Sequence, residues 1–368
     1  MRILQVVSSS ATSGAERHTI YLAKSLRDLG HHVEVICPPI DWMVDEFKST
    51  GATVHPVHLK ERWGLPAMRF MSKLLKDGNF DLIHAHLSRA AYISLGASTI
   101  RGVPLVCTVH VETKEPVYRL AARGNNRLVA VSNFISGVLR GQGIKGQYID
   151  VVYNGTDFHD VSYELPPSDV FREFHIPSER RVIGLVGRVA PEKGHHLAIE
   201  AFPNVLRAEP NAHLMFVGRH DGDFHDQLRR RGDELGLEDR VTYTGQRDDI
   251  PRLFDSMDFS ILPSPHKESF GIAVIESMAR SKPVVVSRVG GLSEVVIHEQ
   301  TGLVVDANAH ALGSGMNYLL QNREELERMG RNARMLIQEK FTLAQMVERL
   351  EAVYAKASRK NDNSTTSI

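Results

Sequence analysis

Two cationic side chains bracket a tight turn near the middle of the chain. Arg188 and Lys193 lie in the segment Gly187–Gly194, which follows an apolar run at 182–186 and precedes a helical pattern. A guanidinium and an ammonium group at a strand-to-helix turn suit a phosphate or diphosphate, with help from the helix N-terminus. A surface turn with two solvated cations is the plain alternative. The segment has neither the GxxxxGK[ST] spacing of a Walker loop nor the GxGxxG of dinucleotide-binding dehydrogenases.

Two carboxylates follow in a second strand-to-helix segment. Seven residues separate Glu268 from Glu276. A carboxylate pair can be the acid and nucleophile of a glycosidase, but along a helix these two would lie about 12 Å apart. Glycosidases need about 5 to 9.5 Å, a gap that only the turn at Phe270-Gly271 would provide here. The spacing therefore favours contacts with different hydroxyls of one extended polar ligand over a capping acid plus a surface acid.

The same segment offers backbone donors. Ser269 is expected to cap the following helix, which would leave the amides of Gly271 and Ile272 pointing at a bound group.

The first half of the chain carries weaker signals. Gly14, within Ser13-Gly14-Ala15-Glu16-Arg17, would allow close approach of a ligand at a helix N-terminus. His110 ends an apolar strand pattern at 104–109, where ligands of doubly wound sheets bind. His84 and His86 end a neighbouring strand, so three histidines are expected on one rim. They could bind a metal, but no carboxylate spacing supports one.

An Asp-x-Asp pair provides the other metal candidate. Asp221 and Asp223 could hold Mn²⁺ or Mg²⁺ against a diphosphate. They directly precede a helical stretch, and we interpret Asp223 as its N-cap instead.

Short apolar runs that alternate with helical patterns must position these residues. Strands are expected at 3–8, 32–37, 54–59, 82–86, 104–110, 128–131 and 151–153, and again at 182–186, 214–217, 241–244, 259–262, 283–286 and 303–305. This alternation predicts an α/β fold with parallel sheets covered by helices on both faces, and it occurs twice. Two such domains, if they face each other, would place the ligand site in the cleft between them.

The domain boundaries follow from breaks in the pattern. A proline-rich seam within 160–180 separates an N-terminal domain at 1–165 from a C-terminal domain at 170–341. A last helix, at about 342–357, is expected to pack away from its predecessors, on the N-terminal domain. Residues 358–368 are polar and expected to be disordered.

Composition excludes several classes of protein. The 368 residues include 44 Lys plus Arg and 44 Asp plus Glu, so the net charge is zero and nothing drives the whole chain toward nucleic acid. No apolar run has the 18 to 20 residues of a membrane span, and Gln5 interrupts any signal-peptide pattern. Cys37 and Cys107 are expected to be buried thiols in a reducing cytoplasm.

One stretch suggests contact with a membrane surface. Residues 60–76 combine a tryptophan with an apolar stripe, and Arg69, Lys73 and Lys76 flank that stripe. A basic amphipathic helix of this kind can lie on an anionic membrane. An ordinary helix that covers a sheet is the alternative.

Taken together, these residues resemble the retaining glycosyltransferases of family 4, over about residues 1–355. The marks are the glutamate pair, the turn with Arg188 and Lys193, and several short motifs: Gly14-Ala15-Glu16-Arg17, Ala130-Val131-Ser132, Asn154-Gly155, Val217-Gly218, Gly290-Gly291-Leu292-Ser293-Glu294 and Thr301-Gly302-Leu303. The resemblance implies the GT-B architecture of two facing Rossmann-like domains. The sequence departs from the family at Ser13, often glycine, at Val111, often aspartate, and at Thr156, commonly valine.

The resemblance also implies roles for these residues. Arg188 and Lys193 would hold the donor diphosphate, Glu276 the ribose and Glu268 the transferred sugar, and Phe270, Gly271 and Ile272 would offer backbone amides. The base would lie near Gly218, Gln246 and Arg247. Gly14 would also reach the donor, and His110 would lie beside the reacting sugar. Glu16 and His86 would belong to the acceptor side.

The implied activity is transfer of a sugar from a UDP- or GDP-sugar to a saccharide or lipid-linked acceptor, with retention of configuration and without a metal. Assembly of polysaccharide, lipopolysaccharide or glycolipid is the expected setting, in the cytoplasm or at the inner membrane face. A disaccharide synthase, a phosphorylase, an epimerase or a catalytically silent nucleotide-sugar-binding protein are the alternatives.

Overall fold

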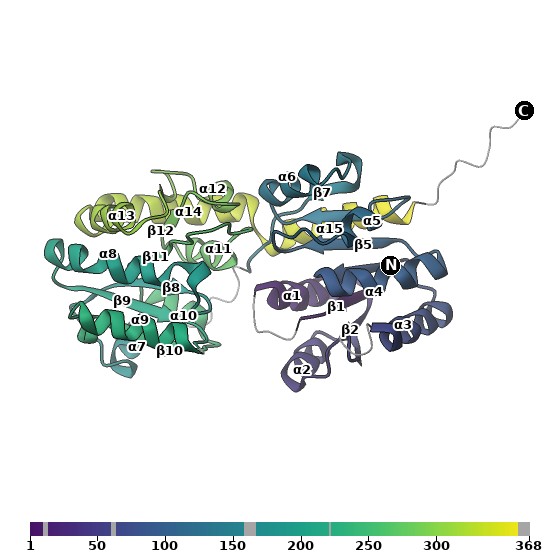
Figure 1. Cartoon of the computed structure of the whole chain (residues 1–368), viewed down its shortest axis with the longest axis horizontal. Coiled ribbons are helices and arrows are strands. Elements are labelled where there is room, and N and C mark those ends of the chain that lie inside the picture. Colours follow the sequence, from purple (N-terminus) through teal and green to yellow (C-terminus); the bar gives the residue numbers. More distant parts are fainter. Residues whose placement is uncertain (10–13, 60–63, 158–166, 221, 360–368) are drawn as a thin grey trace, which may run out of the picture. The chain divides into compact units, whose positions relative to one another are not determined.

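The chain folds into two α/β units in this computed structural model, which describes residues 1–9, 14–59, 64–157, 167–220 and 222–359 (Figure 1). Unit 1 comprises Met1–Gly155 and the segment from Leu343 onward, and unit 2 comprises Thr156–Thr342. The chain therefore passes between the units twice, at Gly155–Thr156 and at Thr342–Leu343. The first crossing lies just before the predicted seam at 160–180.

Unit 1 is built on a parallel sheet of seven strands in the order β3-β2-β1-β4-β5-β6-β7. Its strands are β1 (Arg2–Val7), β2 (His32–Cys37), β3 (Thr53–Pro56), β4 (Leu82–His86), β5 (Leu105–Val109), β6 (Arg127–Ala130) and β7 (Ile149–Val151). Its helices are α1 (Gly14–Asp28), α2 (Asp41–Ser49), α3 (Leu65–Gly78), α4 (Ser88–Arg101), α5 (Val117–Ala121), α6 (Asn133–Gly141) and α15 (Leu343–Ser358), with a 3-10 turn η2 (Gly146–Tyr148).

Unit 2 has a parallel sheet of six strands in the order β10-β9-β8-β11-β12-β13. The strands are β8 (Arg181–Val186), β9 (Ala212–Val217), β10 (Val241–Gly245), β11 (Phe259–Leu262), β12 (Val284–Ser287) and β13 (Gly302–Val305). Its helices are α7 (Pro167–Glu173), α8 (His195–Ala208), α9 (Asp223–Glu234), α10 (Ile250–Asp255), α11 (Ile272–Ala279), α12 (Leu292–Val295), α13 (Ala309–Gln321) and α14 (Arg323–Lys340), with 3-10 turns η3 (Pro191–Lys193) and η4 (Glu238–Arg240).

The predicted fold class is confirmed in both units. Central strands such as β5 and β12 are buried along their whole length, as expected where helices cover both faces of a parallel sheet. The strand predicted at 151–153 is displaced, because β7 spans Ile149–Val151. The predicted tail at 358–368 lies outside the described residues from 360 onward.

The last helix completes the core of unit 1. Helix α15 packs against α1, β4 and β5, and its Met346, Leu350 and Tyr354 belong to the core of unit 1, where all three are nearly fully buried. Figure 1 shows this helix in yellow beside the blue strand β5. The N-terminal part of the chain therefore relies on residues from the far end of the sequence for its packing.

Candidate functional site

The chemistry-bearing residues of unit 2 collect at the point where its strand order reverses. Strands β8 and β11 are neighbours in the middle of the sheet, although β9 and β10 lie between them in sequence. The loop 187–194 follows β8, and the loop 263–271 follows β11, so both leave the carboxyl edge of the sheet side by side. Ligands of doubly wound sheets bind at such a position.

Two ion pairs connect the charged groups of these loops. The Lys193 Nζ donates to Glu268 Oε2 at 2.6 Å, and both side chains are partly buried, with exposures of 27% and 17%. Arg188 pairs with Glu192 of its own loop, where both side chains are exposed. An exposed pair of this kind contributes only about 0 to 1 kcal/mol, so the Arg188 guanidinium can exchange this partner for an incoming anion at little cost.

Two glycines allow the loops to touch. Gly194 has φ +79°, and a Cβ atom there would lie 1.9 Å from the carbonyl oxygen of Pro263. Gly290 has φ +56°, and its Cβ would lie 2.0 Å from the Glu268 carbonyl oxygen, which also accepts a hydrogen bond from the Gly291 amide at 2.8 Å. The backbone at Pro263 and at Glu268 therefore touches Gly194 and Gly290, and a residue larger than glycine at either position would prevent this close approach.

Helix α11 begins later than its predicted cap. Its N-cap is Gly271, in the left-handed region at φ +93°, so the prediction that Ser269 caps the helix was wrong. Phe270 is buried, and its ring packs edge-on against Phe341 with centroids 5.9 Å apart. Glu276 lies in the second turn of the helix and is half-buried, while Ile272 opens the first turn.

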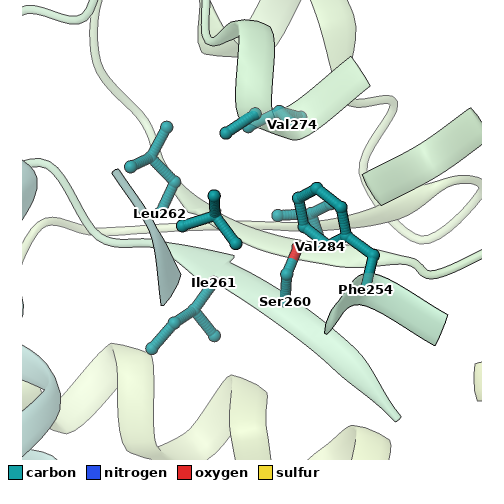
Figure 2. A pocket seen from close by; sticks show the side chains of 8 residues that line it. Phe254, Ser260, Ile261, Leu262, Val274 and Val284 are labelled. Carbon is teal, nitrogen blue, oxygen red and sulfur yellow. The ribbon is translucent and has the colours of Figure 1, made fainter. Parts of the chain in front are cut away.

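The floor beneath α11 is apolar and closely packed. A cavity of about 10 Å³ lies between β11 and α11. Figure 2 shows Phe254, Val274 and Val284 among its lining side chains. The Ser260 hydroxyl, the polar group in the lining, donates to Ser277 Oγ at 2.7 Å. This space holds at most one water molecule, so it serves packing and not ligand binding.

The loops after β9 and β10 lie at the same edge of the sheet. Gly218 follows β9 with φ +147°, and a Cβ there would lie 2.2 Å from the Gly187 carbonyl oxygen. Gln246 is exposed. Arg247 donates twice to Asp249, with both distances 2.8 Å, and pairs with Glu173 at 2.7 Å. These hydrogen bonds from Arg247 lower the pKa of Asp249 to about 2.

The Asp-x-Asp pair lies at the start of α9. This helix begins at Asp223 with Gly222 as its N-cap, so the prediction that Asp223 is the cap was wrong by one position. Asp221 lies outside the described residues.

Unit 1 has its own reversal of strand order, between β1 and β4. Gly14 is the first residue of α1, and Glu16 in its first turn is 1% exposed, while Ser13 lies outside the described residues. His86 ends β4, and His110 follows β5, so the predicted rim is present.

Histidines from three elements meet at this rim. His86 Nδ1 and His110 Nε2 are 3.1 Å apart, and the His18 ring of α1 lies edge-on to His110 with centroids 5.0 Å apart. His18 was not predicted from the sequence. His84 contacts His86, but its two nitrogens are bonded to Tyr354 Oη and Thr108 Oγ1, each at 2.7 Å. Burial lowers the pKa of His18 to about 4.

Helix α3 does not present its apolar stripe to solvent. Met71 and Leu75 are buried within unit 1, while Leu65 and Phe70 are exposed beside the exposed Arg69, Lys73 and Lys76. Residues 60–63, including the tryptophan, lie outside the described residues. Among the described helices, none has the length and apolar character that crossing a bilayer requires.

Comparison with known proteins agrees with this arrangement. Residues 12–160 match the family described as Glycosyltransferase Family 4, and residues 168–336 match Glycosyl transferases group 1. The chain is 28% identical over 336 residues to the phosphatidyl-myo-inositol mannosyltransferase of Mycobacterium tuberculosis, with 86% of each chain covered.

Solved structures share the fold. A glycosyltransferase from Rickettsia africae superimposes with a TM-score of 0.87 at 23% identity, over 98% of this chain and 99% of that one. The HepE protein of Anabaena, in complex with UDP-glucose, gives a TM-score of 0.86 at 24% identity, over 96% of this chain and 99% of the other. The two family matches together extend from residue 12 to residue 336, and the chain therefore belongs to glycosyltransferase family 4, as an enzyme of GT-B architecture.

Proposed function

We propose that this glycosyltransferase takes its sugar from a nucleotide-diphosphate donor bound at the carboxyl edge of the unit 2 sheet, and that the transfer proceeds with retention and without a metal ion. The main support for this proposal is the ion pair between Lys193 and Glu268, which lies where the strand order reverses between β8 and β11. A cation held at a fixed place by a partly buried carboxylate can face a diphosphate without reorganising when charge develops on the leaving group.

The roles of the other donor-side residues follow from their positions. Arg188, exposed and paired with its loop neighbour Glu192, would provide the second contact to the diphosphate. Glu268 would accept hydrogen bonds from the sugar, and Glu276 from the ribose. The N-terminus of α11 favours negative charge next to Gly271. Arg247 is engaged by two carboxylates, so we propose that the base is read mainly by the backbone near Gly218 and Gln246.

We assign the acceptor to unit 1, with His110 beside the reacting sugar and Glu16 and His86 behind it. The M. tuberculosis relative is named as a mannosyltransferase of a phosphatidylinositol lipid. A lipid-linked or saccharide acceptor, in polysaccharide, lipopolysaccharide or glycolipid assembly, fits this chain as well.

A peripheral contact with the inner membrane face is part of this proposal. The exposed Leu65 and Phe70 of α3, with Arg69, Lys73 and Lys76 around them, offer apolar and cationic groups on one helix. Replacing Arg69 and Lys73 by glutamate should reduce binding to vesicles that contain anionic lipid. Unchanged binding would remove the membrane from the proposal and leave the donor site unaffected.

Calorimetric titration in EDTA tests the donor site. UDP, GDP, ADP and their sugar conjugates are titrated into the purified chain, and one nucleotide series is expected to bind. Arg188→Ala and Glu276→Ala should each weaken binding roughly tenfold or more, because each removes a charge-assisted hydrogen bond worth about 1.5 to 3 kcal/mol. Asp221→Ala and Asp223→Ala are the matched controls and should bind as the wild type does.

Four outcomes would argue against this assignment. Equal losses in all four variants would mean that the site is misplaced. Binding that requires Mn²⁺ would indicate that the diphosphate is held by a metal ion at Asp221 and Asp223 instead. Donor turnover without any acceptor would favour an epimerase, and binding without turnover would favour a silent homologue.

A further inference from the structure

The histidines His18, His86 and His110 form a compact, buried triplet in unit 1. Each offers one ring nitrogen, and these three nitrogens lie within 4.8 Å of one another. The ring centroids form a nearly equilateral triangle with sides of 5.7, 5.0 and 5.4 Å. The three side chains come from α1, β4 and the residue that follows β5, so the framework of the sheet holds them together.

Within the described part of the chain, hydrogen bonds do not occupy every nitrogen of this triplet. Among the described residues, neither His18 Nε2 nor His86 Nε2 has a hydrogen-bond partner, although both atoms are buried. His86 Nδ1 and His110 Nε2, 3.1 Å apart, are close to the separation of about 3.3 Å that two nitrogens adopt on a tetrahedral ion at 2.0 to 2.1 Å. Unpartnered polar atoms in a protein interior are costly. An ion ligated by His18 Nε2 would satisfy that atom, while His86 would ligate through Nδ1.

We propose that His18, His86 and His110 bind one transition-metal dication, Zn²⁺ being the best match, with a solvent molecule or an anion in the fourth position. Imidazole nitrogens suit zinc, copper and nickel, whereas Mg²⁺ and Ca²⁺ prefer oxygen. Three histidines with one open position form a known type of zinc coordination.

His84 supports the triplet from behind, since its ring lies 4.1 Å from that of His86 and is anchored to Tyr354 and Thr108.

An ion here would inhibit the enzyme. This consequence rests on the proposed function, in which His110 lies beside the transferred sugar, because a metal-bound His110 could no longer make that contact. The ion takes no part in the transfer itself, so metal binding and donor binding are separate measurements.

The test uses full-length chain without a histidine tag, stripped of metal. ZnCl₂ is titrated by calorimetry, and CoCl₂ by the visible absorption of four-coordinate cobalt. We expect one equivalent of each metal to bind, and we expect His18→Gln and His86→Gln to weaken binding at least about tenfold. The control is His220→Gln, which alters a different histidine pair, the stack of His220 on His225 with centroids 4.2 Å apart, and should leave binding unchanged.

Absence of stoichiometric binding would overturn the proposal, as would equal affinity in His18→Gln or a loss in His220→Gln. Circular dichroism checks folding, and His18→Gln decides the matter if His86→Gln does not fold. Donor titration of the same samples in EDTA tests the proposed function independently. The metal-site proposal and the donor-site proposal can therefore fail separately.

Discussion

Replacing Gly194 by alanine should loosen the contact between the two loops that carry Lys193 and Glu268. The left-handed backbone at φ +79° alone costs alanine about 1 kcal/mol. The new Cβ would also lie 1.9 Å from the Pro263 carbonyl oxygen, whereas real Cβ atoms essentially never come closer than 3.0 Å to another heavy atom. Moving the loops apart by about 1 Å adds on the order of 1 to 3 kcal/mol, as overpacking generally does. We therefore expect unit 2 to lose about 2 to 4 kcal/mol.

Gly236→Ala separates the two contributions. Gly236 has φ +69°, but no described atom outside its immediate chain neighbours would lie within 4 Å of a Cβ added there. Its replacement therefore carries the backbone cost without the clash. Both tryptophans of the chain, Trp42 and Trp63, belong to unit 1. In urea unfolding, tryptophan emission therefore reports unit 1, while far-ultraviolet circular dichroism reports both units.

The expected result is a dichroism transition that shifts further in Gly194→Ala than in Gly236→Ala, with the emission transition unchanged. Donor binding should weaken in Gly194→Ala alone, because its loops no longer hold Lys193 against Glu268. Equal destabilisation by the two substitutions would show that the contact with Pro263 is unimportant, and that the two loops are not held together in the way described above.

Three further predictions concern buried groups. Burial lowers the pKa of His213 to about 4, so its stabilising contribution is complete above pH 6.5 and is lost as the pH falls toward 4, about 2 kcal/mol by pH 5. His213→Gln should flatten the pH dependence of the dichroism transition. Tyr354→Phe leaves a buried nitrogen of His84 without its partner and should cost unit 1 about 1 to 3 kcal/mol, read by tryptophan emission. Burial raises the pKa of both Cys37 and Cys107, so alkylation in native buffer should proceed only at the rate of unfolding; rapid labelling would contradict this burial.

The alternation of apolar runs and helical patterns was sufficient to predict the two parallel sheets, because buried parallel strands are continuous apolar segments. The turn with Arg188 and Lys193 was visible for a similar reason, since glycine and proline mark it locally. The pairing of Lys193 with Glu268 was not visible. It joins residues 75 positions apart, and it depends on β8 and β11 being neighbours in the sheet.

The remaining gaps in the sequence prediction also have physical causes. His18 was missed because nothing in its local helical pattern shows that the start of α1 packs against the ends of β4 and β5. The apolar stripe of α3 was correctly located, but periodicity cannot tell whether such a stripe faces a membrane or the protein's own core. The cap of α11 was misplaced because Ser269 is a good capping residue, whereas the left-handed geometry of Gly271 starts the helix two residues later.

The return of α15 to unit 1 has a consequence for biosynthesis. A ribosome releases the chain from its N-terminus, so unit 2 is complete and can fold while unit 1 still lacks a helix of its core. His84, for instance, is synthesised 270 residues before its hydrogen-bond partner Tyr354. Until Leu343–Ser358 has left the exit tunnel, the nascent unit 1 exposes the apolar surface that this helix will cover. A chain truncated before Leu343 should therefore bind chaperones, because its unit 2 is folded while its unit 1 lacks a helix of its core.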